Sequence, residues 1–487
     1  MQFSRRSLIK AGVAGGALLT AASGKAALAA QTSQPKPEGQ AVPKPTFVLD
    51  VAEGTINAAG VSFKGPLSGN TFPGTPLRFT EGDTFRVLVN NRLAEPTCIH
   101  WHGLLLPSLL DGVPEIAQLP IEPNTSQYYE FPLVQQGTYY YHSHFGVQEQ
   151  YGLLGSLIID AKENPYSYDR EEVVMLNDII AQDGAEVIKE LRTKEMRADA
   201  PDPYLAKGQG RFDIDVHYDG YTINGKSNDA PWTLKAKKGE RIRLRIINGS
   251  GSSFFRIKID GIPMTVIESD GNRVEPIEAD DLMIGTSERY DVLIEIPESG
   301  SFGFHAAVLG DNRQALGVIH SEDVKPEVSD APVKFSGNSV SYRDLRAFEK
   351  RPFIQGAPRN HDVILSGNMK AYEWMMNEHY WPEPFALPGA TKTYLDVSEG
   401  ELVRLRMINR SPMYHPMHLH GHTFKVMGLA DDEESAPIKD SIWVAPRSTV
   451  EIAFYADNPG MWAYHCHNIW HLAVGMMQPV RYVPPSV

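Results

Sequence analysis

The sequence predicts an all-β protein made of three consecutive Greek-key β-sandwich domains. Three observations lead to this fold class. The chain of 487 residues is too long for one ordinary domain and suggests about three. Its 41 glycines and 35 prolines indicate many turns, which favours short strands over long helices. The third observation is an internal repeat that divides the chain into three similar parts.

Each copy of the repeat is a turn, formed by a glycine beside an acidic residue, that leads into a strand of alternating polar and apolar residues and ends at an asparagine. Gly82, Gly239 and Gly400 lie about 160 residues apart, a spacing that suits three copies of a domain rather than a solenoid. We therefore expect each copy to belong to a small antiparallel β-sandwich. The copies cover residues 81–90, 238–248 and 399–409.

Residues 1–30 resemble a twin-arginine signal peptide. Arg5 and Arg6 precede an apolar run rich in alanine and glycine, and an A-x-A cleavage motif ends at Ala29. The run is too short to span a bilayer, and no other segment is apolar enough, so we expect no stable membrane insertion. The twin-arginine export machinery would then deliver the protein to the periplasm or outside the cell.

The rest of the chain divides at changes in composition and at the repeats. Proline-rich or polar stretches mark a tether after the signal and a linker before the last repeat. The expected order is a flexible tether at 31–45, a first domain at 46–162, a second at 163–325, a linker at 326–357 and a third domain at 358–487.

The formal net charge of the chain is −14. The first 29 residues carry four basic and no acidic side chains, so their removal would leave −18. So acidic a protein should repel nucleic acid and anionic membrane surfaces. We expect its partners to be small molecules or cations.

The chain has only two cysteines, Cys98 and Cys466. A disulfide between them is the alternative to consider in an exported protein. Cys466 stands among candidate metal ligands, however, and we therefore predict a metal-binding thiolate at Cys466 and a buried free thiol at Cys98.

The twelve residues from His465 to Met476 hold three histidines, a cysteine and a methionine. Aromatic residues before them predict a β-strand, on which side chains alternate between faces. Cys466 would point one way and His465 and His467 the other, so that one strand could serve two metal sites. His471 and Met476 would fold back on the side of the cysteine. A thiolate, histidine and a weak thioether are the ligands of a blue-copper site, although this stretch alone equally fits a surface histidine pair beside a buried apolar cysteine.

Three further His-x-His pairs decide between these interpretations. Eight paired histidines plus a separate Cys/His/Met set exceed the needs of a tetrahedral zinc site, and imidazole beside a thiolate and a thioether favours copper. The six other histidines, His422 among them, are interpreted as structural or surface residues. The four pairs are His100/His102, His142/His144, His418/His420 and His465/His467, with His415 ahead of the third.

The middle copy of the repeat keeps the strand but lacks these ligands. Counted from the asparagine of each repeat, the pairs of the first and third copies correspond, with the first copy one residue longer. In the middle copy the positions of His415, His418 and His420 hold Phe254, Ile257 and Ile259. We expect the middle domain to act as a spacer that lets the other two meet around shared metal ions, since binding sites often lie between domains.

The four clusters, in this order and with these spacings, resemble the four copper-binding motifs of the multicopper oxidases, the family of laccases, ferroxidases, cuprous oxidases and ascorbate oxidase. The likeness covers nearly all of the chain after the signal peptide and implies cupredoxin-like domains and four copper ions. It implies a type 1 copper held by His415, Cys466 and His471, with Met476 as the axial ligand. It implies a type 2 copper held by His100 and His418, and a type 3 pair held by His102, His142, His144, His420, His465 and His467.

The resemblance also implies a mechanism. A reducing substrate would give one electron at a time to the type 1 copper, and Cys466 would pass it through His465 and His467 to the trinuclear cluster, where four electrons reduce O2 to two waters. Asp111 would lie near the type 2 copper and relay protons. The alternative for Asp111 is the start of a tight Asp-Gly turn. A thioether at Met476 would give a moderate redox potential.

Two features differ from the exported copper-resistance oxidases and bacterial laccases that the motifs resemble most. No acid stands between His467 and His471, where many bacterial members carry one; Asn468, Ile469 and Trp470 fill that gap. The methionines from Met369 to Met376, with His379, form only a thin cluster where cuprous oxidases carry a Met/His-rich insertion. Core packing is the favoured role of these methionines.

The predicted function is therefore a laccase-like multicopper oxidase that uses O2 and a reducing substrate. Phenols and aromatic amines, Cu(I), Fe(II) and Mn(II) all stay open as that substrate. The alternative is a periplasmic copper-tolerance protein acting as a cuprous oxidase or by sequestration. A copper-free scaffold is excluded because every ligand position is filled, and a copper nitrite reductase is shorter and lacks the eight-histidine set.

Overall fold

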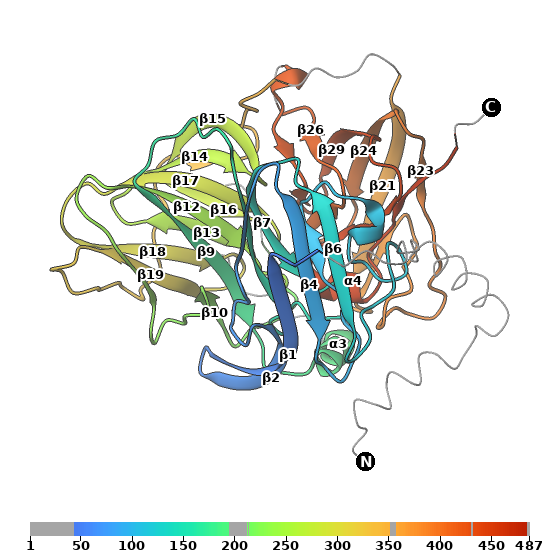
Figure 1. The fold of residues 1–487 in the computed structure, drawn as a ribbon, viewed down its shortest axis with the longest axis horizontal. Helices are drawn as coiled ribbons and strands as arrows, with labels where there is room; N and C mark the ends of the chain where they lie inside the picture. Colours follow the sequence, from blue (N-terminus) through green and yellow to red (C-terminus); the bar gives the residue numbers. More distant parts are fainter. Residues whose placement is uncertain (1–42, 194–211, 213, 351–356, 430–431, 485–487) are drawn as a thin grey trace.

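The computed structural model describes residues 43–193, 212, 214–350, 357–429 and 432–484. These residues form seven β-sheets and little helix, which confirms the predicted all-β class (Figure 1). The predicted signal peptide and most of the tether lie outside the described residues. No helix that the structure describes is long and apolar enough to cross a membrane. The helical elements within the described ranges are α3 (Gly184–Thr193), α4 (Ile469–Ala473), and the 3-10 turns η1 (Ser108–Leu110) and η2 (Glu433–Ser435).

The first domain consists of two four-stranded sheets, in the orders β2-β1-β4-β6 and β3-β8-β7-β5. Strands adjacent in a sheet are often not adjacent in sequence, as a Greek-key sandwich requires. The strands are β1 (Phe47–Ala58), β2 (Val61–Ser68), β3 (Leu77–Thr80), β4 (Thr84–Asn91), β5 (His100–His102), β6 (Ser126–Pro132), β7 (Gly137–His142) and β8 (Leu154–Asp160).

The middle domain has two six-stranded sheets, in the orders β10-β9-β12-β17-β14-β15 and β11-β19-β18-β13-β16-β20. Its last strand, β20, lies inside the stretch predicted as a linker and pairs with β16. The strands are β9 (Arg170–Ile179), β10 (Gly220–Ile223), β11 (Trp232–Lys235), β12 (Arg241–Asn248), β13 (Phe255–Ile259), β14 (Met264–Ser269), β15 (Asn272–Ala279), β16 (Asp281–Ile284), β17 (Arg289–Glu295), β18 (Ser301–Val308), β19 (Gln314–His320) and β20 (Ser339–Val340).

The third domain has one six-stranded sheet, β22-β21-β24-β29-β26-β27, and two three-stranded sheets, β23-β32-β30 and β28-β25-β31. The strands are β21 (Arg359–Asn368), β22 (Glu373–Met376), β23 (Leu395–Val397), β24 (Leu402–Asn409), β25 (His415–Leu419), β26 (Phe424–Val426), β27 (Ile438–Lys439), β28 (Ser441–Val444), β29 (Thr449–Tyr455), β30 (Met461–Trp462), β31 (Tyr464–Cys466) and β32 (Val480–Tyr482).

The predicted repeat corresponds to one structural position in each domain. The repeat strands β4, β12 and β24 each lie between a parallel neighbour (β1, β9 or β21) and an antiparallel neighbour (β6, β17 or β29). The glycine of each turn, Gly82, Gly239 or Gly400, has a φ of 83°, 76° or 85°. Glycine adopts this left-handed conformation without steric cost, which explains its place in the repeat.

The asparagine that ends the first repeat strand is Asn91, and not Asn90 as the sequence pattern suggested. The side chains of Asn91, Asn248 and Asn409 each accept a hydrogen bond from the backbone amide two residues later, at 2.9, 3.1 and 2.8 Å. Counted from Asn91, the first copy no longer carries an extra residue before its histidine pair.

The large hydrophobic cores do not correspond one to one with the three domains. One contiguous core includes residues of both the middle and the third domain, from Val174 to Val480. The first domain packs around a separate core that includes Phe85 and Trp101, whose ring centroids are 4.7 Å apart. The exact domain boundaries stay a prediction.

Candidate metal centres

The strand pairings bring the histidine clusters together. In the first domain β5 runs antiparallel to β7, with His100 opposite His142. In the third domain β25 runs antiparallel to β31, with His418 opposite His465. Each pair of strands therefore presents its histidines at one end of a sheet, as the alternation of side chains along a strand requires.

The histidines of the first domain face those of the third. The rings of His100 and His420 stack with centroids 3.8 Å apart, and those of His102 and His418 at 3.7 Å. The Nε2 atom of His465 lies 3.0 Å from Nε2 of His420 and 3.3 Å from Nε2 of His144. Seven of the eight rings are buried and His144 is half-buried. The eight-histidine centre, as we call it, comprises His100, His102, His142, His144, His418, His420, His465 and His467.

The ring nitrogens at this centre suit a metal ion. Within the described part of the chain, four of them are buried and have no hydrogen-bond partner. Burial holds the pKa of His102, His142 and His418 well below the ordinary value, so these rings are neutral and keep a free lone pair. Neutral imidazole nitrogens without partners are what a copper ion needs as ligands. The four atoms are His100 Nε2, His102 Nδ1, His142 Nε2 and His418 Nε2.

Asp111 connects the two domains at the centre. Its backbone carbonyl oxygen lies 2.8 Å from Nδ1 of His100, and its Oδ2 lies 2.8 Å from Nδ1 of His420. The side chain is fully buried. A metal-ligating histidine usually donates its other N–H to a carbonyl or carboxylate oxygen, and Asp111 supplies one of each. Gly112, which follows with a φ of 84°, completes the predicted Asp-Gly turn.

Two further groups contact this centre that the sequence did not reveal. Oε2 of Glu149 lies 3.0 Å from Nδ1 of His142, and burial raises the pKa of this carboxyl well above the ordinary value. The hydroxyl of Tyr140 lies 3.1 Å from Nε2 of His467. Glu149 follows the second His-x-His pair by five residues, and an acid so close to a ligand pair could have served as a signal.

A second centre lies on the other side of β31. Sγ of Cys466 is 3.6 Å from Nδ1 of both His415 and His471, and these two nitrogens are 3.2 Å apart. The predicted alternation of His465, Cys466 and His467 is therefore correct. Burial raises the pKa of the Cys466 thiol, so a metal ion would have to displace its proton. We call this group the thiolate centre.

Met476 lies next to the thiolate centre. Its backbone carbonyl oxygen accepts a hydrogen bond from the Cys466 amide at 3.1 Å, and its side chain is buried in the same hydrophobic core. The helix α4 begins after Asn468, whose side chain accepts from the amides of Trp470 and His471 and so fixes the turn that brings His471 back. The predicted fold-back of His471 is confirmed.

A cavity next to the thiolate centre contains an acid that the sequence analysis missed. Oδ2 of Asp215 lies 3.1 Å from Nε2 of His471 and accepts a hydrogen bond from the Tyr372 hydroxyl at 2.6 Å. Burial would raise the pKa of Asp215, but the contacts with His471 and Tyr372 outweigh it and hold the pKa below the ordinary value. The cavity is lined by Asp215 and Asn468 and by the aromatic side chains of Phe212, Tyr218, Tyr221, Phe254 and Tyr414.

The residues interpreted as structural make other contacts in the structure. His422 contacts the Tyr482 hydroxyl at 2.7 Å through Nε2 and the His420 carbonyl at 3.0 Å through Nδ1. Cys98 and Cys466 are both free, so the disulfide alternative is wrong and the buried free thiol at Cys98 is confirmed. Met369 and Met376 are buried in the core, as expected.

Comparison with known proteins gives a consistent result. Three profiles described as multicopper oxidase match residues 50–164, 170–322 and 354–486. The multicopper oxidase MmcO of Mycobacterium tuberculosis is 34% identical, over 99% of this chain and 97% of that protein. Copper resistance protein A of Escherichia coli is 28% identical, over 99% of both chains. Among solved structures, Fet3p, described as a multicopper oxidase that functions in iron import, superposes with a TM-score of 0.76 at 24% identity and 90% coverage of each chain.

Proposed function

The chain belongs to the multicopper oxidases, oxidoreductases that couple the oxidation of a reducing substrate to the reduction of dioxygen, and on this premise we propose that it is a laccase-like enzyme with four copper ions. The observation that carries the proposal is the division of three consecutive residues between two centres. Cys466 faces the thiolate centre, and His465 faces the eight-histidine centre.

In this assignment the thiolate centre holds the type 1 copper, with Met476 as the axial ligand. The eight-histidine centre holds the other three ions. His100 and His418 are assigned to the type 2 copper by resemblance to the family; each has an Nε2 without a partner among the described residues and an Nδ1 next to a backbone carbonyl oxygen. The type 3 pair is assigned to His102, His142, His144, His420, His465 and His467.

When bound, the copper ions would supply one-electron steps from the reductant and the four-electron reduction of dioxygen to water. The chain supplies the connection between the centres. Cys466 is covalently joined to His465 and His467 on either side, so a short path of main chain links the two metal sites. The neutral, buried histidines keep the eight-histidine centre free of competing protons.

Asp111 is proposed to relay protons to the eight-histidine centre. Its carboxylate is buried and already contacts His420, and no acid stands between His467 and His471 to serve instead. The Asp-Gly turn at Gly112 is compatible with this role, since it fixes the carboxylate in place.

An aromatic reductant with a hydroxyl or amino group, oxidised through His471, is the substrate class that we favour by resemblance to the laccases. The cavity beside His471 has room for about one water molecule, so we assign Asp215, which contacts Nε2 of His471, to the positioning of that histidine and not to substrate binding. Copper tolerance through Cu(I) oxidation is the second candidate. It is favoured by the similarity to copper resistance protein A, whose name states a role in copper resistance.

We also propose that residues 1–30 direct twin-arginine export and that the enzyme acts in the periplasm or outside the cell. The paired Arg5 and Arg6 support this proposal. An Arg5→Lys, Arg6→Lys double variant should keep the protein in the cytoplasm, as cell fractionation would show.

The test of the function is oxygen uptake by copper-loaded protein with phenols, aromatic amines, Cu(I), Fe(II) and Mn(II) offered separately. We expect about four copper ions per chain, a blue absorption from the copper thiolate, and the fastest uptake with a phenol or amine. A colourless protein without copper would refute the assignment, and uptake with Cu(I) alone would select the copper-tolerance role.

A further inference from the structure

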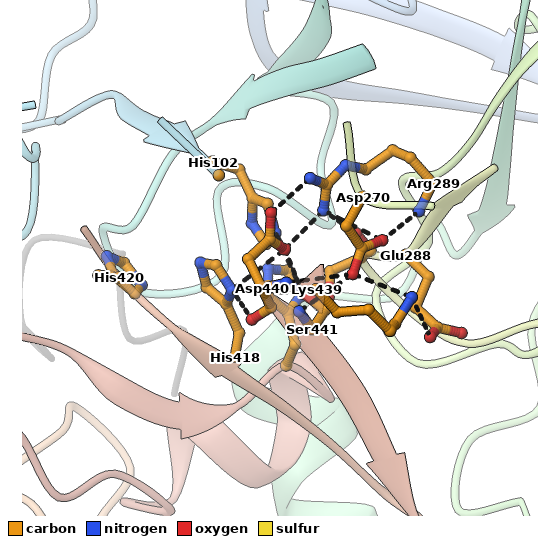
Figure 2. A network of polar contacts seen from close by, with 12 residues as sticks. His102, Asp270, Glu288, Arg289, His418, His420, Lys439, Asp440 and Ser441 are labelled. Atoms are coloured by element: carbon orange, nitrogen blue, oxygen red, sulfur yellow. Dashed lines mark hydrogen bonds and ion pairs between the residues drawn. The ribbon is translucent and has the colours of Figure 1, made fainter. Parts of the chain in front are cut away.

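A fully buried network of ion pairs joins the middle domain to the third domain next to the eight-histidine centre (Figure 2). The third domain contributes Lys439 and Asp440. Lys439 Nζ lies 3.0 Å from Oδ2 of Asp270 and 3.1 Å from Oε1 of Glu288, both from the middle domain. No side chain of this network is more than 1% exposed.

Arg289 of the middle domain contacts all three domains. Its Nη1 donates to Oδ1 of Asp440 at 2.7 Å and its Nη2 to Oδ2 at 2.5 Å, a bidentate pair with the third domain. Its Nε donates to the backbone carbonyl oxygen of Thr138 at 3.1 Å, on strand β7 of the first domain. Its Nη1 also lies 3.6 Å from Oδ1 of Asp270, the acid that pairs with Lys439.

Asp440 in turn contacts one histidine from each of the two metal-binding domains. Its Oδ1 lies 3.3 Å from Nε2 of His102, and its backbone carbonyl oxygen lies 2.8 Å from Nδ1 of His418. The hydroxyl of Ser441 lies 3.3 Å from the same two nitrogens.

These contacts leave opposite ring nitrogens for a metal ion. In His102 the atom without a partner among the described residues is Nδ1, whereas in His418 it is Nε2. His100 and His142 also leave Nε2. Among these four rings, His102 is therefore turned the other way, and the acid that holds it in that orientation is Asp440.

We propose that Arg289 and Asp440 are positioning residues for the eight-histidine centre, and that through them the middle domain fixes His102 with Nδ1 as its ligand atom. The middle domain is thus more than the spacer that its missing ligands suggest. The inference rests on the proposed function, because it assumes that this centre holds copper.

The physical reason is the cost of an unpaired buried charge. The buried side chain of Asp440 has the guanidinium of Arg289 as its bidentate partner, and without Arg289 the buried acid would lose its main partner. A residue that does not bind the metal itself but hydrogen-bonds to one of its ligands typically contributes about 10–100-fold in metal affinity or activity.

The test replaces Arg289 in the copper-loaded enzyme. We expect Arg289→Met to keep the blue absorption and its anaerobic reduction by substrate, but to lose copper from about four toward about one per chain and to slow reoxidation by O2 about 10–100-fold. Arg289→Lys, which keeps the positive charge but cannot form the bidentate pair with Asp440, should recover part of the loss. An Arg289→Met enzyme with unchanged copper content and reoxidation rate would overturn the inference.

The matched control is Arg256→Met. Arg256 also forms a buried bidentate pair, with Asp281 at 2.7 and 3.0 Å, but both residues lie within one sheet of the middle domain. We expect this variant to keep its copper and its reoxidation rate. An equal loss in Arg256→Met would show a general effect of destabilisation and would reject the positioning role.

Two further measurements keep the proposal testable. If Arg289→Met gives no folded protein, Arg289→Gln is measured in its place, with the same expected loss and the same contrary outcome. A crystal structure of the copper-loaded wild type should show His102 bound through Nδ1, and binding through Nε2 would overturn the inference. If the wild-type protein itself lacks copper, the proposed function has failed. If the wild type holds copper and the Arg289 variants match it in copper content and reoxidation rate, only the inference has failed.

Discussion

The two centres differ in how the chain builds them. The thiolate centre takes His415, Cys466 and His471 from the third domain alone, on β25, β31 and the adjoining helix α4. The eight-histidine centre takes half of its histidines from each of two domains, and its His144 and His465 are 321 residues apart in sequence. A change at a domain interface should therefore damage the second centre and spare the first.

The strongest test of this separation is Cys466→Ser. Loss of the thiolate should abolish the blue absorption and reduce substrate oxidation by more than about 100-fold, since even outer contacts are worth 10–100-fold. Copper analysis should still find about three ions per chain, because the eight histidines do not depend on the sulfur. Loss of all copper in this variant would show that the two centres are not independent.

Asp111→Asn tests the eight-histidine centre. The amide keeps the shape of the side chain but cannot carry a proton as a carboxyl does, so reoxidation by O2 should slow about 10–100-fold. Anaerobic reduction of the blue copper should keep its rate, which stopped-flow absorbance would measure. An unchanged rate of reoxidation and an unchanged pH profile would leave Asp111 only its role in the turn.

Asp215→Asn should affect the thiolate centre alone. The carboxylate contacts Nε2 of His471, and a contact that orients a metal ligand is typically worth about 10–100-fold, so the oxidation of phenols should slow about 10-fold. Because the pKa of Asp215 lies below its ordinary value of 3.8, the carboxylate is present above that pH and is lost only as the pH falls further. The ratio of the wild-type to the variant rate should therefore stay constant from pH 7 down to about 4, and a ratio that falls across this range would contradict the assignment.

Met476→Leu should have the smallest effect. Removing the weak thioether ligand should raise the potential of the blue copper by on the order of 0.1 V, a small part of the range that axial ligands control. Copper content and dioxygen reduction should not change. A redox titration that finds the potential equal or lower would exclude Met476 as the axial ligand.

The sequence predicted those parts of the site that depend on the order of neighbouring residues along the chain. The alternation of His465, Cys466 and His467 follows from strand geometry, and the repeat located the corresponding histidines in two domains. The same counting placed Phe254, Ile257 and Ile259 in the middle domain, where all three are buried.

The sequence could not predict contacts made across domains. Asp215 and His471, or Arg289 and Asp440, are brought together by domain packing, and no spacing in the chain encodes that meeting. The lysine-acid pair at Lys439 and Asp440, between the apolar Ile438 and Ile442, was the one local sign of a buried polar network. The asparagine of the first repeat was misplaced by one residue because Asn90 and Asn91 are adjacent, and only the hydrogen bond to the amide of the second residue after it distinguishes them.

The continuous core under the middle and third domains also determines how the molecule should melt. Val174 and Val480 belong to one packed body, whereas the first domain has a core of its own. Two cooperative units are therefore expected in a calorimetric scan of the metal-free chain, rather than three. Ions bound between these units stabilise only the docked form, so loading with metal should raise both transitions and bring them together.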